Sequence, residues 1–429
     1  MSKNRMIKEF YRYSADFFNF LHDNIAGDPA ALRLKCAGKN LPFPVGEAID
    51  QIECRRKTRK KLPFFNSCRS FLYPAVQASE QATNQYVASY HAMLAGAAED
   101  EGRRILDMTA GLGIDAFTMA LAGAQVTAIE LDSHRAKILS LNAEALNLPS
   151  LNAICGDSVA MLESYAGPPF NTIFIDPARR DSANRRTYFL EDSLPDVTLH
   201  APMMLRHARR VIIKASPILD ITRAIGQLPD VAEIHAVCLR GECKEVLIIL
   251  DRGSGKLSEE HSRGIKMVAV DLKGDDEDEY PYRNPRMASI FEFTSRQGSR
   301  KSLFATDDDI RDAEYIYNPN AGVHKLNCSA ELCEKFPAIR QISPNTELYV
   351  SQKPVADFPG TAFRIAERPD RKQLKRLKKE SYAVITRNYT MTADELRRKL
   401  GVSESDSRFI IGCRAGMKAN PEIFICEKL

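Results

Sequence analysis

The sequence predicts an α/β fold class built on a doubly wound, mostly parallel sheet of seven strands, and three observations support this prediction. Five short apolar runs between residues 104 and 217 alternate with segments of helical spacing, such as residues 133–148. That alternation is typical of parallel strands joined by crossover helices. The first four runs each end at or next to an acidic residue. Two β-like runs then flank Arg240-Gly241-Glu242, which predicts an antiparallel last hairpin ending near Arg252.

The composition is that of an ordinary globular protein. The chain has 429 residues, of which 44% are hydrophobic and 27% charged, and this length suits about two to four domains. Its net charge of +4 permits a nucleic-acid partner without requiring one. No apolar stretch approaches about 18 residues, and the N-terminus lacks the features of a signal peptide. We therefore expect a cytoplasmic protein with no membrane span.

The ten cysteines do not follow a metal-binding pattern. The chain has no Cys-x-x-Cys pair and no His-Glu-x-x-His motif. The pairs Cys238/Cys243 and Cys328/Cys333 are spaced too widely for a zinc knuckle. We therefore expect reduced thiols and no bound metal.

Residues 1–78 are predicted to form an N-terminal helical region. The apolar residues that recur there at spacings suited to one helix face are Phe10, Phe17, Phe18 and Leu21. A basic run at residues 55–61 has two interpretations, a solvated segment or a phosphate contact. The next helix is predicted over residues 79–98, with Ser79 as its cap.

The rest of the chain divides into three further predicted parts. Residues 79–252 hold the predicted sheet. A polar linker then leads into a small α+β segment, residues 253–345, in which the acidic, proline-containing stretch 274–285 predicts an exposed loop. The last part, residues 346–429, contains the strongly basic segment 368–379 and further predicted strands.

The stretch LDMTAGLGIDAF, residues 106–117, carries the clearest ligand signal. Gly111-x-Gly113-x-x-Ala116 fits the glycine turn of dinucleotide-binding sites, in which a pyrophosphate lies over a helix N-terminus. Asp107 would repel that anion, but it suits the ammonium and sulfonium charges of S-adenosylmethionine (SAM). Asp115, inside the turn, adds to the same argument. The stretch therefore favours SAM, and the alternative is an oxidoreductase that binds a nicotinamide or flavin dinucleotide.

Acidic residues at the ends of the next three runs complete the predicted site. Glu130 suits a bidentate contact with ribose hydroxyls. Asp157, or the backbone next to it, suits the amino group of adenine. Asp176 follows the fourth run, where the methyl acceptor should meet the cofactor. Because open α/β sheets bind ligands at the carboxyl ends of their strands, we expect these acids to converge on one site.

These motifs resemble those of class I SAM-dependent methyltransferases over about residues 80–252. The resembling stretches are Asp107 to Gly113, Glu130, Gly156-Asp157 and the box Asp176-Pro177-Ala178-Arg179-Arg180. The resemblance implies a Rossmann-like sheet with SAM as cofactor. The cofactor residues that it implies are Asp107, Thr109, Gly111, Gly113, Asp115, Glu130, Leu131, Asp157, Ser158 and Asp176.

A narrower resemblance extends to the C-terminal part. The box at Asp176, residues 214–221, residues 241–247 and the basic C-terminal segment resemble bacterial methyltransferases with a THUMP-like domain. THUMP domains are RNA-binding modules, so the resemblance implies an RNA substrate. It also implies a ferredoxin-like domain at residues 253–345 and a THUMP-like domain at residues 346–429.

The residues predicted to act in catalysis are Asp176, Pro177, Arg179 and Lys214. Amino-directed nucleic-acid methyltransferases resemble one another in an Asn/Asp-Pro-Pro-aromatic box, from which this chain departs at Ala178 and Arg179. A guanidinium in place of the ring can still stack on a base or hold a phosphate. Uracil-C5 enzymes resemble the box more closely, but their cysteine is absent after the next strand, where Lys214 stands. Lys214 has two interpretations, a contact with the acceptor or its phosphate, or a pair with an acid.

Three functions remain open from the sequence. The first is SAM-dependent methylation of a base in ribosomal or transfer RNA, which the arginines near Asp176 and the basic segment 368–379 support. The second is methyl transfer to a small molecule or a protein. The third is a non-catalytic RNA-binding protein that retains SAM. The sequence makes no prediction of the oligomeric state.

Overall fold

A computed structural model describes residues 13–100, 102–178, 189–254, 264–274, 280–295 and 303–429 of the chain. Its contacts divide the chain into two compact units. Unit 1 comprises Met1–Glu233, Val246–Ser262 and Leu272–Arg286, and unit 2 comprises Ile234–Glu245, Arg263–Asp271 and Met287–Leu429. The domain boundaries predicted at residues 78, 252 and 345 stay predictions.

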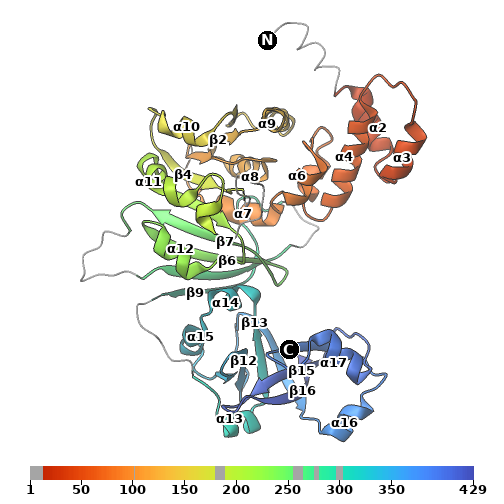
Figure 1. The fold of residues 1–429 in the computed structure, drawn as a ribbon, viewed down its shortest axis with the longest axis vertical. Helices are drawn as coiled ribbons and strands as arrows, with labels where there is room; N and C mark the ends of the chain where they lie inside the picture. Colours follow the sequence, from red (N-terminus) through yellow and green to blue (C-terminus); the bar gives the residue numbers. More distant parts are fainter. Residues whose placement is uncertain (1–12, 101, 179–188, 255–263, 275–279, 296–302) are drawn as a thin grey trace. The chain divides into compact units, whose positions relative to one another are not determined.

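The first sheet begins with five parallel strands in the order β3-β2-β1-β4-β5. Two of them, β2 and β4, are labelled in Figure 1. Their bounds are β1 (Arg104–Asp107), β2 (Gln125–Glu130), β3 (Leu151–Cys155), β4 (Phe170–Ile175) and β5 (Ala208–Ala215). β5 pairs antiparallel with β7 (Glu242–Asp251). The hydrogen-bonded order then continues through β6 (Val231–Leu239), β8 (Lys266–Leu272) and β9 (Met287–Thr294). The prediction of an α/β fold with a large, mostly parallel sheet is therefore confirmed.

The sheet has nine strands where the sequence predicts seven. The two additional strands, β8 and β9, come from the segment that the sequence analysis assigns to a separate α+β domain. An edge strand leaves backbone N–H and C=O groups unpaired, and further strands satisfy them. The predicted hairpin is formed by β6 and β7. Its turn residues Arg240 (φ 55°) and Gly241 (φ 77°) both have positive φ, as a two-residue type I′ turn requires.

One helix follows each parallel strand in the chain. These helices are α8 (Ile114–Ala122), α9 (Ser133–Ala145), α10 (Ser158–Glu163), α11 (Val197–His207) and α12 (Ile221–Gln227). All but α8 begin at an aspartate whose carboxylate accepts a backbone N–H of the first turn, and these are Asp132, Asp157, Asp196 and Asp220. Such a cap contributes about 1 kcal/mol to helix stability. α8 instead begins at Gly113, in the predicted glycine turn.

The N-terminal region is helical, as the sequence predicts. Its helices are α2 (Ala15–Asp23), α3 (Pro29–Cys36), α4 (Val45–Thr58), α5 (Pro63–Ser67), α6 (Val76–Gln81) and α7 (Gln85–Leu94). Phe17 and Leu21 of the predicted apolar face are fully buried, and they belong to the same core cluster as Ile49 and Ile52 of α4. Phe10 lies outside the described residues.

The basic run at residues 55–61 is largely used inside unit 1. Arg55 is buried, and its two Nη atoms donate to four backbone carbonyl groups, those of Asn66, Cys68, Arg69 and Phe71. Lys57 Nζ lies 2.7 Å from Glu80 Oε1. For Arg55, neither predicted interpretation holds, because the side chain stabilises the turn between α5 and α6 rather than meeting solvent or a phosphate.

The stretch predicted as an exposed loop, residues 274–285, is anchored in unit 1 by Tyr280. Residues 275–279 lie outside the described part, but the Tyr280 side chain is buried. Its hydroxyl lies 2.8 Å from Thr118 Oγ1 of α8 and donates to the carbonyl of Gln85 at 2.9 Å. Its ring packs beside Phe64 and Phe65. The exposed-loop prediction is wrong at this residue, because composition alone does not reveal a single long-range anchor.

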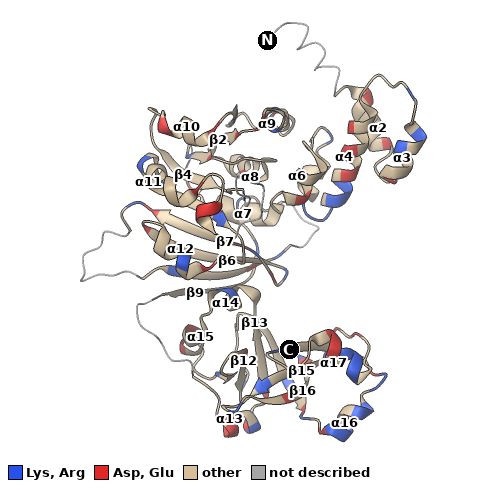
Figure 2. Ribbon diagram, viewed as in Figure 1, with Lys and Arg blue, Asp and Glu red and all other residues tan. Residues whose placement is uncertain are grey.

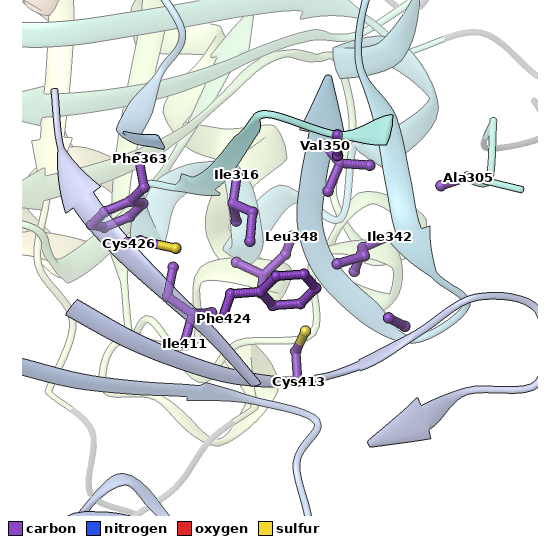
Figure 3. Packing of buried hydrophobic residues seen from close by; sticks show 12 residues of the cluster. Ala305, Ile316, Ile342, Leu348, Val350, Phe363, Ile411, Cys413, Phe424 and Cys426 are labelled. Atoms are coloured by element: carbon purple, nitrogen blue, oxygen red, sulfur yellow. The ribbon is translucent and has the colours of Figure 1, made fainter. Parts of the chain in front are cut away.

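Unit 2 contains a second sheet of seven strands, in the order β11-β12-β10-β13-β16-β15-β14. Their bounds are β10 (Tyr315–Pro319), β11 (Arg340–Ser343), β12 (Thr346–Ser351), β13 (Gly360–Glu367), β14 (Ala383–Arg387), β15 (Arg408–Ala415) and β16 (Asn420–Lys428). All neighbouring pairs are antiparallel except β14 and β15. The side chains of Ile316, Leu348, Phe363, Ile411 and Phe424 meet in its core (Figure 3).

The helices of unit 2 are short. They are α13 (Asp307–Asp312), α14 (Ala321–Leu326), α15 (Ser329–Lys335), α16 (Arg371–Arg376) and α17 (Ala393–Leu400). Helix α17 has a defined cap at each end. Thr392 and Glu395 form a reciprocal capping box, and Gly401 ends the helix with φ 68°.

Three features are absent from the described ranges. None of their helices is both long and apolar enough to cross a bilayer. Nor do these ranges contain a cluster of three His, Cys, Asp or Glu side chains placed to hold a metal ion. These ranges also contain no disulfide, because all ten cysteines are free thiols.

We predict that Tyr280→Phe lowers the free energy of unfolding of unit 1 by about 1–2 kcal/mol, because Thr118 and Gln85 lose a buried hydrogen-bond partner. Urea unfolding followed by circular dichroism measures the change. Tyr282→Phe is the matched control, since no described hydrogen bond involves the Tyr282 hydroxyl. Equal stability of the two variants would contradict an anchoring role for Tyr280.

Candidate active site

The glycine turn between β1 and α8 requires glycine at two positions. Gly111 has φ 55° and Gly113 has φ 91°, both in the left-handed region. A Cβ at Gly113 would also collide with the side chains of Leu139 and Phe117. Around Gly111 there is space, because the nearest atom to a Cβ built there is Thr109 O at 3.9 Å. The turn therefore packs tightly against α9 at Gly113 and stays open to a ligand at Gly111.

Glu130, the last residue of β2, holds this turn in place. Its Oε2 accepts the Gly111 N–H at 2.9 Å, and its Oε1 accepts the Asp132 N–H at 2.9 Å. A carboxylate has about four lone-pair sites, so both oxygens keep capacity for a further hydrogen bond. The next residue, Leu131, is 74% exposed and presents an apolar surface beside the carboxylate.

Asp107, the last residue of β1, is a buried carboxyl group with little compensation. It is only 2% exposed, and its one described hydrogen bond comes from the Thr109 N–H to Oδ1 at 3.1 Å. Burial, together with the nearby charge of Asp115, raises the pKa of Asp107 to about 8. A buried carboxylate of this kind is stabilised by a cation placed next to it.

Asp115, in the first turn of α8, is also buried but is well compensated. Its Oδ1 lies 2.7 Å from His91 Nδ1, and its Oδ2 accepts the Thr83 hydroxyl at 2.6 Å. Burial alone would raise the pKa of Asp115, but His91, Lys214 and Thr83 together outweigh it and lower the pKa to about 2. Asp115 is therefore ionised at neutral pH, while its neighbour Asp107 is largely protonated in the absence of a ligand.

Lys214, near the end of β5, connects this group to the acceptor side. Its Nζ donates to Asp176 Oδ2 at 2.7 Å and to Thr83 Oγ1 at 3.0 Å, and its side chain is only 6% exposed. The Asp176 N–H donates to Thr109 Oγ1 at 2.7 Å. A continuous hydrogen-bond chain thus runs from His91 through Asp115, Thr83 and Lys214 to Asp176. Of the two interpretations of Lys214, pairing with an acid is the one observed.

Most residues predicted for the site lie together in unit 1. Hydrogen bonds join Asp107 to Thr109 and Thr109 to Asp176. Asp176 is in turn bonded to Lys214. Glu130 accepts a hydrogen bond from the backbone of Gly111. Asp157 uses Oδ1 to cap α10, and Ser158 is the buried first residue of that helix. Beyond Asp176 and Pro177, Ala178 forms an antiparallel bridge with Leu194. Arg179 lies outside the described residues, as do Arg180, Arg185 and Arg186.

Sequence reasoning missed Thr83 and His91. Both lie in the segment that the sequence analysis interprets only as a helix. Thr83 precedes the N-cap of α7, His91 lies within α7, and both side chains bind Asp115. The His91 side chain is completely buried and packs against Phe174 of β4. The available signal was a histidine within a run of small and apolar residues that precedes the first strand. That signal does not identify its carboxylate partner.

Comparison with known proteins locates two domains in the C-terminal part. Residues 360–428 match the family model of a THUMP domain-like domain, and residues 315–359 match that of a ferredoxin-like domain. The predicted resemblance to proteins with a THUMP-like domain is therefore confirmed.

Two curated relatives match parts of the chain, and both are named ribosomal RNA small subunit methyltransferase J. The protein from Alteromonas mediterranea is 29% identical over 148 residues, which cover 31% of this chain and 57% of that protein. The protein from Ectopseudomonas mendocina is 29% identical over 128 residues, which cover 26% of this chain and 49% of that protein. The chain thus spans about half the length of these relatives.

A solved structure matches nearly the whole fold. It is the crystal structure of a protein from Porphyromonas gingivalis W83 that is described as a proposed methyltransferase. The two chains are 22% identical, the match covers 98% of each, and the TM-score is 0.77. At this identity the similarity concerns the fold.

We predict that Asp107→Asn flattens the pH dependence of stability. With a folded pKa of about 8, against the usual 3.8, the folded chain binds more protons than the unfolded chain between about pH 4 and pH 8. The stability contributed by protonated Asp107 is therefore lost as pH rises through this window. Relative to Asp107→Asn, the chain should lose up to about 1.4 kcal/mol per pH unit.

Urea unfolding at pH 5, 6 and 7 measures this difference. Asp132→Asn is the control for the Asp-to-Asn change itself, because Asp132 is an exposed cap of α9. Parallel pH profiles for the chain and Asp107→Asn would contradict the raised pKa.

Proposed function

We propose that this chain is a SAM-dependent methyltransferase that transfers a methyl group to a base of ribosomal RNA. The observation that carries the proposal is Asp107, buried at the end of β1 with a raised pKa and, among the described residues, no cationic side chain bonded to it. A positively charged ligand beside this carboxyl group would favour its ionised form. SAM carries an ammonium and a sulfonium and has no phosphate.

The residues around Asp107 fit the rest of the cofactor. The open space at Gly111 lets the ligand approach the backbone, and Glu130 has lone pairs left for two ribose hydroxyls. Exposed Leu131 offers an apolar surface for the adenine ring, and Asp157 Oδ2 has no described partner and suits the adenine amino group. SAM supplies an activated methyl group when bound.

Asp176 is the proposed acceptor-binding residue. Its side chain is 35% exposed, Lys214 holds Oδ2, and Oδ1 has no partner among the described residues. Oδ1 can therefore accept an N–H of the base and orient the nucleophile, which is what methyl transfer requires of the protein. Lys214 is a positioning residue, because its Nζ holds the Asp176 carboxylate through Oδ2. Pro177 and Arg179, the latter outside the described residues, complete the proposed box.

The proposal of an RNA substrate draws on unit 2 and on the relatives. Two relatives are named ribosomal RNA methyltransferases, and residues 360–428 match a THUMP-like model. Helix α16 exposes Arg371, Lys372, Lys375 and Arg376, and it appears as a blue segment in Figure 2. Exposed cations of this kind bind a phosphate backbone with strong salt dependence.

Methyl transfer into RNA tests the proposal. We expect labelled methyl groups from SAM to enter small-subunit ribosomal RNA isolated from a strain that lacks this gene. Asp176→Asn should retain SAM binding but reduce the rate at least about a hundredfold, because the acceptor loses its charged orienting group. Label in protein alone, or full activity of Asp176→Asn, would overturn the proposal or the role of Asp176.

The pH dependence of SAM binding tests the role of Asp107. A cationic ligand selects the ionised carboxylate, and with a pKa of about 8 that form becomes more abundant as pH rises. SAM affinity should therefore increase by up to roughly tenfold between pH 6 and pH 7. Calorimetry at the two pH values measures it. Asp107→Asn should bind SAM weakly and with little pH dependence, whereas equal affinities at both values would contradict the model.

A further inference from the structure

Thr83 lies in the short link between helices α6 and α7, and the ends of both helices hold it there. Ala82, the C-cap of α6, donates its backbone N–H to the carbonyl of Ala78. Asn84, the N-cap of α7, accepts the Tyr86 N–H with its side chain. The Thr83 side chain is buried, and a β-branched side chain has few χ1 rotamers, so its hydroxyl has a defined position.

The Thr83 hydroxyl contacts two charged groups, and their charges fix the direction of both hydrogen bonds. It donates to Asp115 Oδ2 at 2.6 Å and accepts from Lys214 Nζ at 3.0 Å. A carboxylate only accepts, an ammonium only donates, and a hydroxyl has one proton and two lone pairs. The single hydroxyl proton is therefore directed at Asp115 and a lone pair at Lys214. Valine resembles threonine in shape but offers neither the donor nor the acceptor.

Lys214 is attracted by two carboxylates at once. Its Nζ donates to Asp176 Oδ2 at 2.7 Å, and the charge of Lys214 also lowers the pKa of Asp115. Lys214 and Asp115 are both buried, so water screens their mutual attraction only weakly. The Asp176 side chain is 35% exposed, and water screens its attraction for Lys214 more strongly. Charge alone therefore draws Lys214 towards Asp115 and away from the acceptor side.

We propose that Thr83 is a positioning residue of the methyl-transfer site, because its hydroxyl lies between Lys214 and Asp115 and so keeps Lys214 on Asp176. The inference rests on the proposed function, in which Asp176 orients the acceptor. The hydroxyl satisfies Asp115 with its proton and Lys214 with a lone pair, and a direct ion pair of these two groups would displace both hydrogen bonds. Thr83 thus acts on the acceptor through Lys214 and Asp176.

Methyl transfer by Thr83→Val tests this role. With SAM and small-subunit ribosomal RNA both saturating, kcat should fall by about tenfold, the effect of one lost hydrogen bond to a charged group. The Kd for SAM should change by less than about twofold, because the loss affects the acceptor side and not the binding of the cofactor. Thr83→Ser keeps the hydroxyl and should retain kcat to within about threefold of the unsubstituted chain.

Thr172→Val is the matched control. Thr172 of β4 is fully buried, and its hydroxyl donates to the carbonyl of Ala95 at 3.1 Å, so this substitution also removes one buried hydrogen bond. Its kcat should stay within about twofold of the unsubstituted chain even where its stability falls. A similar loss of kcat in both valine variants would leave Thr83 only a structural role and refute the proposal. If Thr83→Val does not fold, Thr83→Ala also removes the hydroxyl and carries the same expectation.

A crystal structure of Thr83→Val tests the position of Lys214 without an assay of activity. We expect Nζ to leave Asp176 Oδ2 and to form a direct ion pair with Asp115, at an N···O distance below about 4 Å. In Thr83→Ser, Nζ should stay on Asp176. A valine variant in which Lys214 still contacts Asp176 as before would overturn the proposal.

The two proposals fail in different ways. If the chain transfers no methyl group to RNA but Lys214 moves to Asp115 in Thr83→Val, the proposed function fails and the placement of Lys214 by Thr83 stands. If RNA is methylated and Thr83→Val retains full kcat, the proposal for Thr83 fails and the proposed function stands.

Discussion

The constraint on which the site depends is the presence of two carboxyl groups, Asp107 and Asp115, in one buried region beside the glycine turn. Water cannot solvate both charges there, so the protein must compensate them in another way. His91 and Thr83 compensate Asp115, and nothing equivalent is bonded to Asp107 among the described residues. This asymmetry gives the two acids different charges at neutral pH, and in the proposed function the cationic cofactor compensates Asp107.

The hydrogen bonds that compensate Asp115 also connect the glycine turn to Asp176, the proposed acceptor-binding residue. Thr83 accepts from Lys214 and donates to Asp115, and Lys214 also binds Asp176. Lys214 also helps to lower the pKa of Asp115, so this lysine acts on both carboxylates. Tyr280 stabilises the same region from the side of α8, since it bonds to Thr118. The site is thus built from segments that are far apart in the sequence.

Unit 2 presents different physical features. Its sheet encloses an apolar core (Figure 3), and its helix α16 carries exposed basic residues (Figure 2). An exposed row of cations attracts a phosphate backbone without reading its sequence. In the proposed function, α16 therefore contributes affinity for RNA, and base selectivity has to come from the acceptor side of the site in unit 1.

The sequence by itself determined the α/β class, the glycine turn and the acids at the strand ends, such as Asp107, Glu130 and Asp176. These are local signals, because an apolar run, its terminal acid and the following turn are adjacent in the chain. Only the tertiary structure decided which groups compensate those acids. His91 and Thr83 precede β1, whereas their partner Asp115 follows it. No spacing rule in the sequence therefore connects these residues. The two added strands and the buried Tyr280 were missed for the same reason, since long-range pairing overrides local composition.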